Sequence, residues 1–267
     1  MTQPDERKTR QQEAWGAGDY AAIGSRLVIV SELLCEAVDL RAHHRVLDVA
    51  TGHGNTALAA ARRDCDVIGI DITPSLLEQA RQRAAAEHLR VNFQEGDAEA
   101  ISFPDENFDV VLSTFGVIFA SDSHQAANEL LRACRPCGKI GLTAWAATGA
   151  ATVIDQVYNK YLPPGPPDLW ETEEGLRLLF GDRIASLQVK PRQVVYRFLS
   201  IEACIHTFST TFGPCIRTLK TLEKDRDRFK ADLAEAYRQV NQSGDETFVI
   251  AYDYLEVVAT KWHHNGR

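Results

Sequence analysis

Short apolar runs alternate with helical segments between residues 45 and 145, and this alternation limits the fold more than any other feature of the chain. Strands that alternate with helices in this way are typical of a parallel sheet with helices on both faces. The pattern therefore predicts an α/β fold. The expected strands cover 45–50, 66–71, 91–95, 108–113 and 139–145, and the expected helices cover 55–63, 73–88 and 122–134.

Two flanking regions are expected to add helices to this core. The N-terminal arm, 1–40, holds a short helical segment that Gly16 and Gly18 end, and then a helix over 21–40. With 267 residues, we expect a single domain over 1–267 with its core at 45–147. The region 148–245 is expected to hold helices at 152–162, 201–220 and 224–241 and strands at 186–190 and 194–198, and a final segment, 246–262, ends in a strand at about 254–262.

The charge balance limits the possible partners. The chain carries 29 lysines and arginines against 37 aspartates and glutamates, a net charge of −8, which argues against a general nucleic-acid binder or membrane-surface binder. The longest mostly apolar run, 110–120, is too short to cross a bilayer, and the polar N-terminus lacks the apolar stretch of a signal peptide. We therefore expect a cytoplasmic protein with no membrane span and no nucleic-acid partner.

The cysteines and histidines do not follow a metal-site pattern. Cys134 and Cys137 have C-x-x-C spacing, but a structural zinc site needs a second pair or histidines in register, and none follows. The histidines are scattered, with no carboxylate cluster beside them. No bound metal is expected.

Three aspartates carry the clearest chemical signal. Asp48 ends an apolar strand just before a loop with Gly52 and Gly54, Asp71 ends the second strand, and Asp97 follows the third. One such aspartate alone is often a turn residue or a helix cap. All three lie at the carboxyl ends of expected parallel strands, where open α/β sheets bind ligands. A carboxylate at Asp71 suits the two hydroxyls of a ribose, and one at Asp97 suits the exocyclic amine of adenine.

The same segments resemble the core of class I S-adenosylmethionine-dependent methyltransferases, in particular the small-molecule branch related to ubiquinone and menaquinone C-methyltransferases. The matching stretches occur in order at 46–55, 69–75, 96–105, 108–113 and 130–139. The resemblance implies a Rossmann-like, doubly wound sheet of seven strands whose last strand is antiparallel, with an N-terminal helical arm and a helical lid insertion. It implies S-adenosyl-L-methionine as cofactor and S-adenosyl-L-homocysteine as its product.

The resemblance also assigns roles to individual residues. Asp48 and the loop of Ala50, Thr51, Gly52 and Gly54 would hold the methionine part of the cofactor. Asp71 would bind the ribose, Ile72 would pack on the adenine, Asp97 and Ala98 would read the adenine edge, and Ser113 and Thr114 would lie beside the methionine. Two positions depart from the family pattern, because Ala50 and Cys137 stand where glycines are common.

The substrate-binding residues are harder to predict. Methyl transfer depends on the orientation of the two reactants and on a water-poor pocket more than on particular side chains. We expect a small, partly apolar acceptor with an O, N or C nucleophile, and the sequence leaves the atom and the oligomeric state open. His206 and His124 are candidate general bases. The candidate substrate and lid residues are Trp15, Tyr20, Phe115, Phe119, Phe208 and Phe212.

Two other functions remain open at the level of sequence. An NAD(P)-dependent oxidoreductase would share the glycine loop and Asp71, although an acidic residue at Asp48 would repel the pyrophosphate of a dinucleotide. A non-catalytic S-adenosylmethionine-binding protein is the second, since a fold does not fix a function.

Overall fold

A computed structural model describes residues 3–163 and 168–263 of the chain, and its contacts divide it into two compact units. The first, called here the helical unit, comprises Met1–Arg26, Ala146–Pro167 and Arg192–Tyr254. The second, called the sheet unit, comprises Leu27–Trp145, Asp168–Pro191 and Leu255–Arg267. No helix among the described residues is long and apolar enough to cross a membrane.

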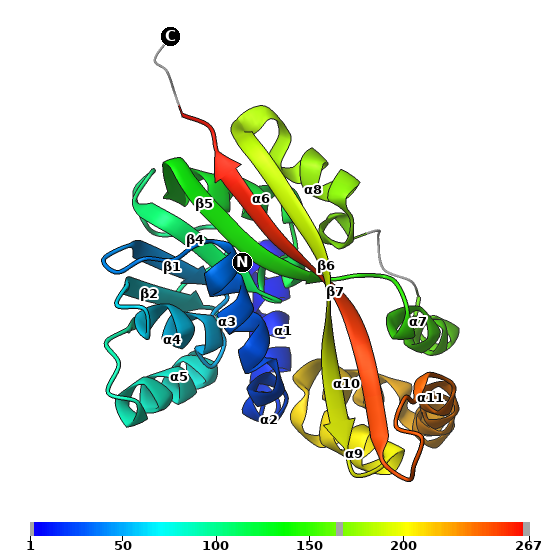
Figure 1. The fold of residues 1–267 in the computed structure, drawn as a ribbon. Coiled ribbons are helices and arrows are strands. Elements are labelled where there is room, and N and C mark those ends of the chain that lie inside the picture. The colour runs from blue at the N-terminus through cyan, green and yellow to red at the C-terminus, as the bar shows by residue number, and fades with distance from the viewer. Residues whose placement is uncertain (1–2, 164–167, 264–267) are drawn as a thin grey trace. The chain divides into compact units, whose positions relative to one another are not determined.

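One mixed sheet has the strand order β3-β2-β1-β4-β5-β7-β6 (Figure 1). Strands β1 to β5 pair in parallel, and β7 is antiparallel, so the predicted seven-stranded sheet with an antiparallel last strand is confirmed. The long strands β6 and β7 run through both units. The strands are β1 Arg45–Val49, β2 Asp66–Asp71, β3 Asn92–Glu95, β4 Phe108–Thr114, β5 Cys134–Trp145, β6 Ile184–Phe198 and β7 Phe248–Lys261.

Apolar side chains on both faces of the central strands form the core of the sheet unit. Helices α3 (Val28–Ala37), α4 (Asn55–Ala61) and α5 (Pro74–Ala86) pack on the face to which Val46 points. Leu47 is also fully buried, and because successive side chains of a strand point to opposite faces, the other face is covered too. The remaining helices of this unit are α6 Ser123–Ala133 and α8 Glu173–Phe180, with 3-10 turns at Val117–Phe119, Leu169–Glu171 and Gly181–Arg183.

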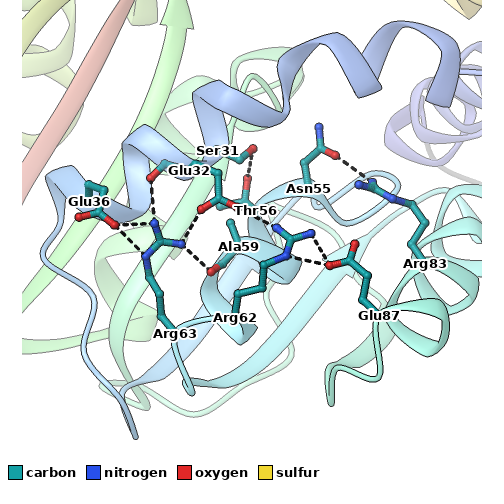
Figure 2. A network of polar contacts seen from close by, with 10 residues as sticks. All are labelled: Ser31, Glu32, Glu36, Asn55, Thr56, Ala59, Arg62, Arg63, Arg83 and Glu87. Carbon is teal, nitrogen blue, oxygen red and sulfur yellow. Dashed lines mark hydrogen bonds and ion pairs between the residues drawn. The ribbon is translucent and has the colours of Figure 1, made fainter.

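Ion pairs join α3 and the end of α5 to α4 (Figure 2). Glu32 on α3 accepts from both Arg62 and Arg63 at 2.7 Å, and Arg62 also pairs with Glu87 at the C-terminal end of α5. These side chains are partly exposed, so each pair adds little alone, but the shared carboxylate makes them a network. The network fixes the helix that begins directly after the glycine loop.

The helical unit combines the first part of the N-terminal arm, up to Arg26, with the insertion before the last strand. Its helices are α1 Gln3–Gly16, α2 Ala21–Gly24, α7 Ala150–Tyr161, α9 Ile201–Thr211, α10 Gly213–Leu222 and α11 Arg226–Val240. Helix α1 packs on α10 so closely that a Cβ at Gly213 would lie 1.6 Å from the carbonyl oxygen of Ala14. A Cβ at Gly18 would lie 2.4 Å from the carbonyl oxygen of Thr211. Arm and insertion are therefore parts of one packed body.

Several predicted element boundaries were wrong. The helix expected over 21–40 is broken by a 3-10 turn at Ser25–Leu27, and the helix expected over 201–220 breaks at Phe212, where Gly213 and Pro214 begin α10. Proline suits the first turn of a new helix because it lacks the N–H that an interior position needs. The two strand candidates near 186–198 form the single strand β6, although Pro191 lies within it. A proline is tolerated there because β6 is the edge strand of the sheet.

Two further differences concern elements that tertiary packing creates. Helix α8 was not predicted, because its eight residues give too short a periodic pattern. Strands β5 and β7 start earlier than expected, at Cys134 and Phe248. Cys137 adopts φ 59° within β5, in the left-handed region that favours glycine.

Candidate functional site

Strand β1 delivers Asp48 into the interior, where the carboxylate is 1% exposed. Its Oδ2 accepts hydrogen bonds from the Thr51 hydroxyl at 2.5 Å and from the Ala57 amide at 2.9 Å. Its Oδ1 is also buried but has no hydrogen-bond partner among the described residues. Burial raises the pKa of Asp48 to about 7. A buried carboxylate oxygen without a donor is costly, so it calls for a functional explanation.

The loop after β1 has an unusual backbone conformation. Ala50, Gly52 and Gly54 have φ values of 54°, 55° and 91°, in the region that favours glycine. A Cβ at Gly54 would lie 3.1 Å from both Ala80 and Phe93, so this position also lacks room for a side chain. Ala50 has a Cβ, so its left-handed conformation costs about 1–2 kcal/mol. A strained backbone at the end of a strand is a frequent property of binding sites.

Asp71 at the end of β2 ties this loop to the neighbouring strand. Its Oδ2 accepts from the Gly52 amide and its Oδ1 from the Thr73 amide, each at 2.8 Å. The side chain is 6% exposed, and burial raises its pKa. A carboxylate has about four acceptor positions, so two remain for a ligand after these two bonds.

The third aspartate follows β3, the strand next to β2. Asp97 is half-buried, and its Oδ1 accepts from the Glu99 amide at 2.9 Å. Ile72 and Ala98 are also half-buried. The structure thus brings the three predicted aspartates to the carboxyl ends of three adjacent parallel strands.

The end of β4 completes the site. The Ser113 hydroxyl donates to the Val49 carbonyl at 2.8 Å and accepts from the Val117 amide at 2.9 Å, so it joins β4 to β1 and to the following turn. Phe115 has φ 51° and stacks on Trp145 with ring centroids 3.8 Å apart. A left-handed phenylalanine costs energy, which the stacked ring and its buried surroundings offset.

Comparison with known proteins shows which family this chain belongs to. A methyltransferase-domain model matches residues 46–138, which include all three aspartates. A demethylmenaquinone methyltransferase of Thermus thermophilus is 34% identical over 161 residues, covering 54% of this chain and 73% of that protein. The chain belongs to the class I S-adenosylmethionine-dependent methyltransferases.

Two further comparisons cover more of this methyltransferase. An uncharacterised protein of Mycobacterium tuberculosis, Rv1405c, is 34% identical over 260 residues and covers 92% of each chain. The crystal structure of the YcgJ protein of Bacillus subtilis matches with a TM-score of 0.63 at 21% identity, covering 87% of this chain and 98% of that one. At this identity the second match reports on the fold alone.

The methyltransferase uses S-adenosylmethionine as its methyl donor. The residues present suit this cofactor, because the partnerless oxygen of Asp48 is an acceptor for a charged amine and the glycine loop leaves backbone close to the site. Membership of this class excludes the NAD(P)-dependent oxidoreductase that the sequence left open.

The predicted substrate-side residues of the methyltransferase fall into both units. Phe115 and Phe119 belong to the sheet unit, where Phe119 is 40% exposed. Trp15, Tyr20 and Phe212 contact one another in the helical unit, with ring centroids 5.6–6.4 Å apart, and Phe208 contacts Phe212 at 5.7 Å.

The two candidate bases are both exposed, and they belong to different units. His124 lies in the first turn of α6 in the sheet unit, and His206 lies on α9 in the helical unit.

Several residues of this region were missed from the sequence. The Thr56 hydroxyl lies 3.0 Å from Ser31 Oγ and 2.7 Å from Thr114 Oγ1, so a chain of three hydroxyls links α3, α4 and β4. Gly116 lies so close to the loop that a Cβ there would be 2.6 Å from the Cβ of Ala50. A glycine just after a strand end was the available signal for this close approach. His53 is 2% exposed, and burial lowers its pKa to about 4.

Among the residues that the structure describes, no group of three His, Cys, Asp or Glu side chains is arranged to hold a metal ion. The six cysteines are all free thiols, and burial raises the pKa of Cys134 to about 12.

Proposed function

We propose that this methyltransferase moves the methyl group of S-adenosylmethionine to an O, N or C nucleophile of a small, partly apolar metabolite. The proposed acceptor class is based on the aromatic cluster of the helical unit, which joins residues far apart in the chain. It contains Trp15, Tyr20, Tyr196, Phe208 and Phe212, in edge or tilted contacts with ring centroids 5.6–6.4 Å apart. Such rings offer apolar contact area with little loss of side-chain entropy.

The cofactor residues follow from the carboxyl ends of the strands. Asp48 and the loop over residues 50–54 hold the methionine part, and the partnerless Oδ1 of Asp48 accepts from its ammonium group. Asp71 binds the ribose hydroxyls with its two remaining acceptor positions. Ile72, Asp97 and Ala98 contact the adenine. Ser113 and Thr114 lie beside the methionine, although the hydroxyl of Ser113 already bonds two backbone groups and so acts by shaping the loop.

Methyl transfer needs few reactive side chains from the protein. When bound, S-adenosylmethionine would supply a methyl carbon made electrophilic by its sulfonium group. What the chain contributes is orientation of the two reactants and exclusion of water. A base is needed only when the nucleophile must lose a proton, and His124 and His206 are the proposed candidates.

The buried tyrosines of the helical unit are poor bases. Burial raises the pKa of Tyr158, Tyr196, Tyr237 and Tyr252 well above that of a free phenol. These phenols stay protonated at neutral pH, so none of them is proposed as the proton acceptor.

The cofactor step is tested by titration calorimetry. Purified protein is titrated with S-adenosylmethionine, S-adenosylhomocysteine and NADH, and the same titrations are done with Asp71→Ala. The matched control is Asp66→Ala, because Asp66 is exposed at the other end of the same strand. We expect micromolar binding of the first two ligands in the wild type and the control, and its loss in Asp71→Ala. Equal binding in both variants would reject the role of Asp71.

The acceptor step is tested by a metabolite screen that measures S-adenosylhomocysteine release. The name of the Thermus thermophilus relative makes demethylated quinones a sensible first group of compounds. Turnover with an apolar acceptor that falls after Phe212→Ala would support the proposal. Binding of the cofactor without turnover of any small molecule would favour the non-catalytic binding protein instead.

A further inference from the structure

Three helices of the helical unit line an open pocket. His206, a candidate base, is one of its lining residues, but methyl transfer gives no role to the cations that line it. The volume of the pocket is about 270 Å³. Helix α9 lines one side, α10 the second and α11 the third. The lining residues are His206, Ser209, Thr210, Ile216, Leu219, Lys220, Arg226 and Lys230.

The spacing of these residues shows that each helix turns one continuous face to the pocket. On α10 the lining positions 216, 219 and 220 are three and four residues apart, and on α11 the positions 226 and 230 are four apart. Residues at these spacings share one side of a helix. The pocket is therefore built by the packing of α10 and α11 around α9, and it is not a gap between loops.

Positive charge dominates the lining. Lys220, Arg226 and Lys230 line the pocket, and no acidic residue does. Neither lysine forms an ion pair or hydrogen bond with any residue that the structure describes. The Nε of Arg226 donates to the Leu219 carbonyl, which holds the guanidinium in place and leaves its two terminal nitrogens for another acceptor.

Acidic side chains are nearby in sequence but do not line the pocket. Glu223, Asp225 and Asp227 lie in the turn before α11 and in its first residues. In a chain of net charge −8, three cations without a lining carboxylate are an uneven local distribution. Such a concentration of one sign in a concave, partly apolar place attracts anions.

We propose that this pocket binds the phosphoryl group of a small ligand. The three cations that line the pocket can neutralise the charge of about −2 on a phosphate monoester, and the planar guanidinium of Arg226 suits its oxygens. Ile216 and Leu219 form an apolar wall for the carbon part next to the ester oxygen. The volume lies just below the range of about 300–1,000 Å³ that drug-sized ligands occupy, so the pocket takes a compact ligand.

The binding experiment is a calorimetric titration of the full-length protein at constant ionic strength in chloride. Inorganic phosphate is the first probe, phenyl phosphate the second and benzoate the third. The test variant is the double substitution Lys220→Gln with Lys230→Gln. The control is Lys190→Gln with Lys224→Gln, which removes the same charge from two exposed lysines outside the pocket.

We expect both phosphates to bind the wild type and the control, and to lose at least about tenfold in affinity in the test variant, because charged hydrogen bonds are lost. Tighter binding of phenyl phosphate than of inorganic phosphate identifies an ester as the source of the phosphoryl group, and the reverse identifies the free ion. An equal loss in control and test variant, no phosphate binding in the wild type, or preferred binding of benzoate would overturn the proposal.

Circular dichroism and S-adenosylmethionine titration of the test variant provide the folding control. Both lysines are outside the cofactor site, so we expect cofactor affinity to stay unchanged. Phosphate binding is measured without turnover, and its result is therefore independent of the acceptor proposed above.

Discussion

The buried carboxylate of Asp48 makes the free protein less stable as the pH rises, and Asp48→Asn removes this effect. The pKa of the group rises from 3.8 to about 7 on folding, chiefly because of burial. Below the lower value both states are protonated, and the group does not affect folding. Between the two values the unfolded state ionises first, so the free energy of unfolding falls, and above the higher value the loss is complete.

The size of the effect follows from the two pKa values. A difference between 3.8 and about 7, at about 1.36 kcal/mol for each pH unit, corresponds to about 4 kcal/mol of lost stability above pH 7. Between pH 5 and pH 8 the loss is about 2–3 kcal/mol, since part of it has already occurred at pH 5. Asparagine does not ionise, so the free energy of unfolding of the variant, relative to wild type, rises by this amount over the same range.

A second, pH-independent contribution has the opposite sign. The amide nitrogen of asparagine would occupy the position of Oδ1, where the structure offers no acceptor among the described residues. A buried donor without a partner costs about 1–3 kcal/mol. The absolute stability of the variant therefore combines both contributions, and only the change with pH isolates the carboxylate.

The assay is urea unfolding followed by circular dichroism at pH 5, 6, 7 and 8, with Asp66→Asn as the control for removal of one exposed carboxylate. In parallel, calorimetry is expected to show about 10- to 100-fold weaker binding of S-adenosylmethionine to Asp48→Asn, from loss of a charge-assisted bond. A stability difference that does not change with pH would show that Asp48 is not the buried, proton-coupled group described here. Unchanged cofactor affinity would reject its role as ligand.

Three other substitutions test contacts within the two units. Gly213→Ala places a Cβ 1.6 Å from the Ala14 carbonyl oxygen and should destabilise the helical unit by at least about 1–3 kcal/mol, seen as a lower melting temperature and faster proteolysis of the N-terminal arm; an unchanged protein would contradict the close packing. Asp71→Asn can accept from only one of the two amides that the carboxylate serves, so both the unfolding free energy and the affinity for S-adenosylhomocysteine should fall, the first by about 1–3 kcal/mol. Thr56→Val removes the centre of the hydroxyl chain to Thr114 and should cost about 0.5–1.5 kcal/mol in urea unfolding, with Thr221→Val, on an exposed helix position, as the comparison.

Much of the cofactor-binding core was predictable because its pattern is local. Strands β1, β2 and β4 are short, mostly apolar runs. Asp48 and Asp71 lie at the ends of β1 and β2, and Asp97 follows β3 by two residues. A parallel sheet then brings these ends together without any further information. The predictions were weakest where a residue's role depends on distant partners, as for Ser113, whose hydroxyl joins two strands and a turn.

The region after residue 148 was less predictable. Helix α8 has only eight residues, too few for a clear periodic pattern. The break between α9 and α10 lies at Gly213 and Pro214, a local signal that the expected helix over 201–220 did not take into account. The contact between the arm and the insertion joins positions about 200 residues apart in the sequence, which no local pattern encodes. The exposure of His124 and His206 likewise depends on which side of a helix is covered, and that is a tertiary property.

The sequence by itself determined the α/β class, the strand-end aspartates and the family, because these depend on hydrophobic period and on residues a few positions apart. Tertiary structure alone decided that one oxygen of Asp48 is buried without a donor, that Ala50 lies against Gly116, and that three cations from α10 and α11 line one pocket. The physical reason is that burial, pKa and charge convergence are set by groups from several elements at once. No stretch of sequence contains all of those groups.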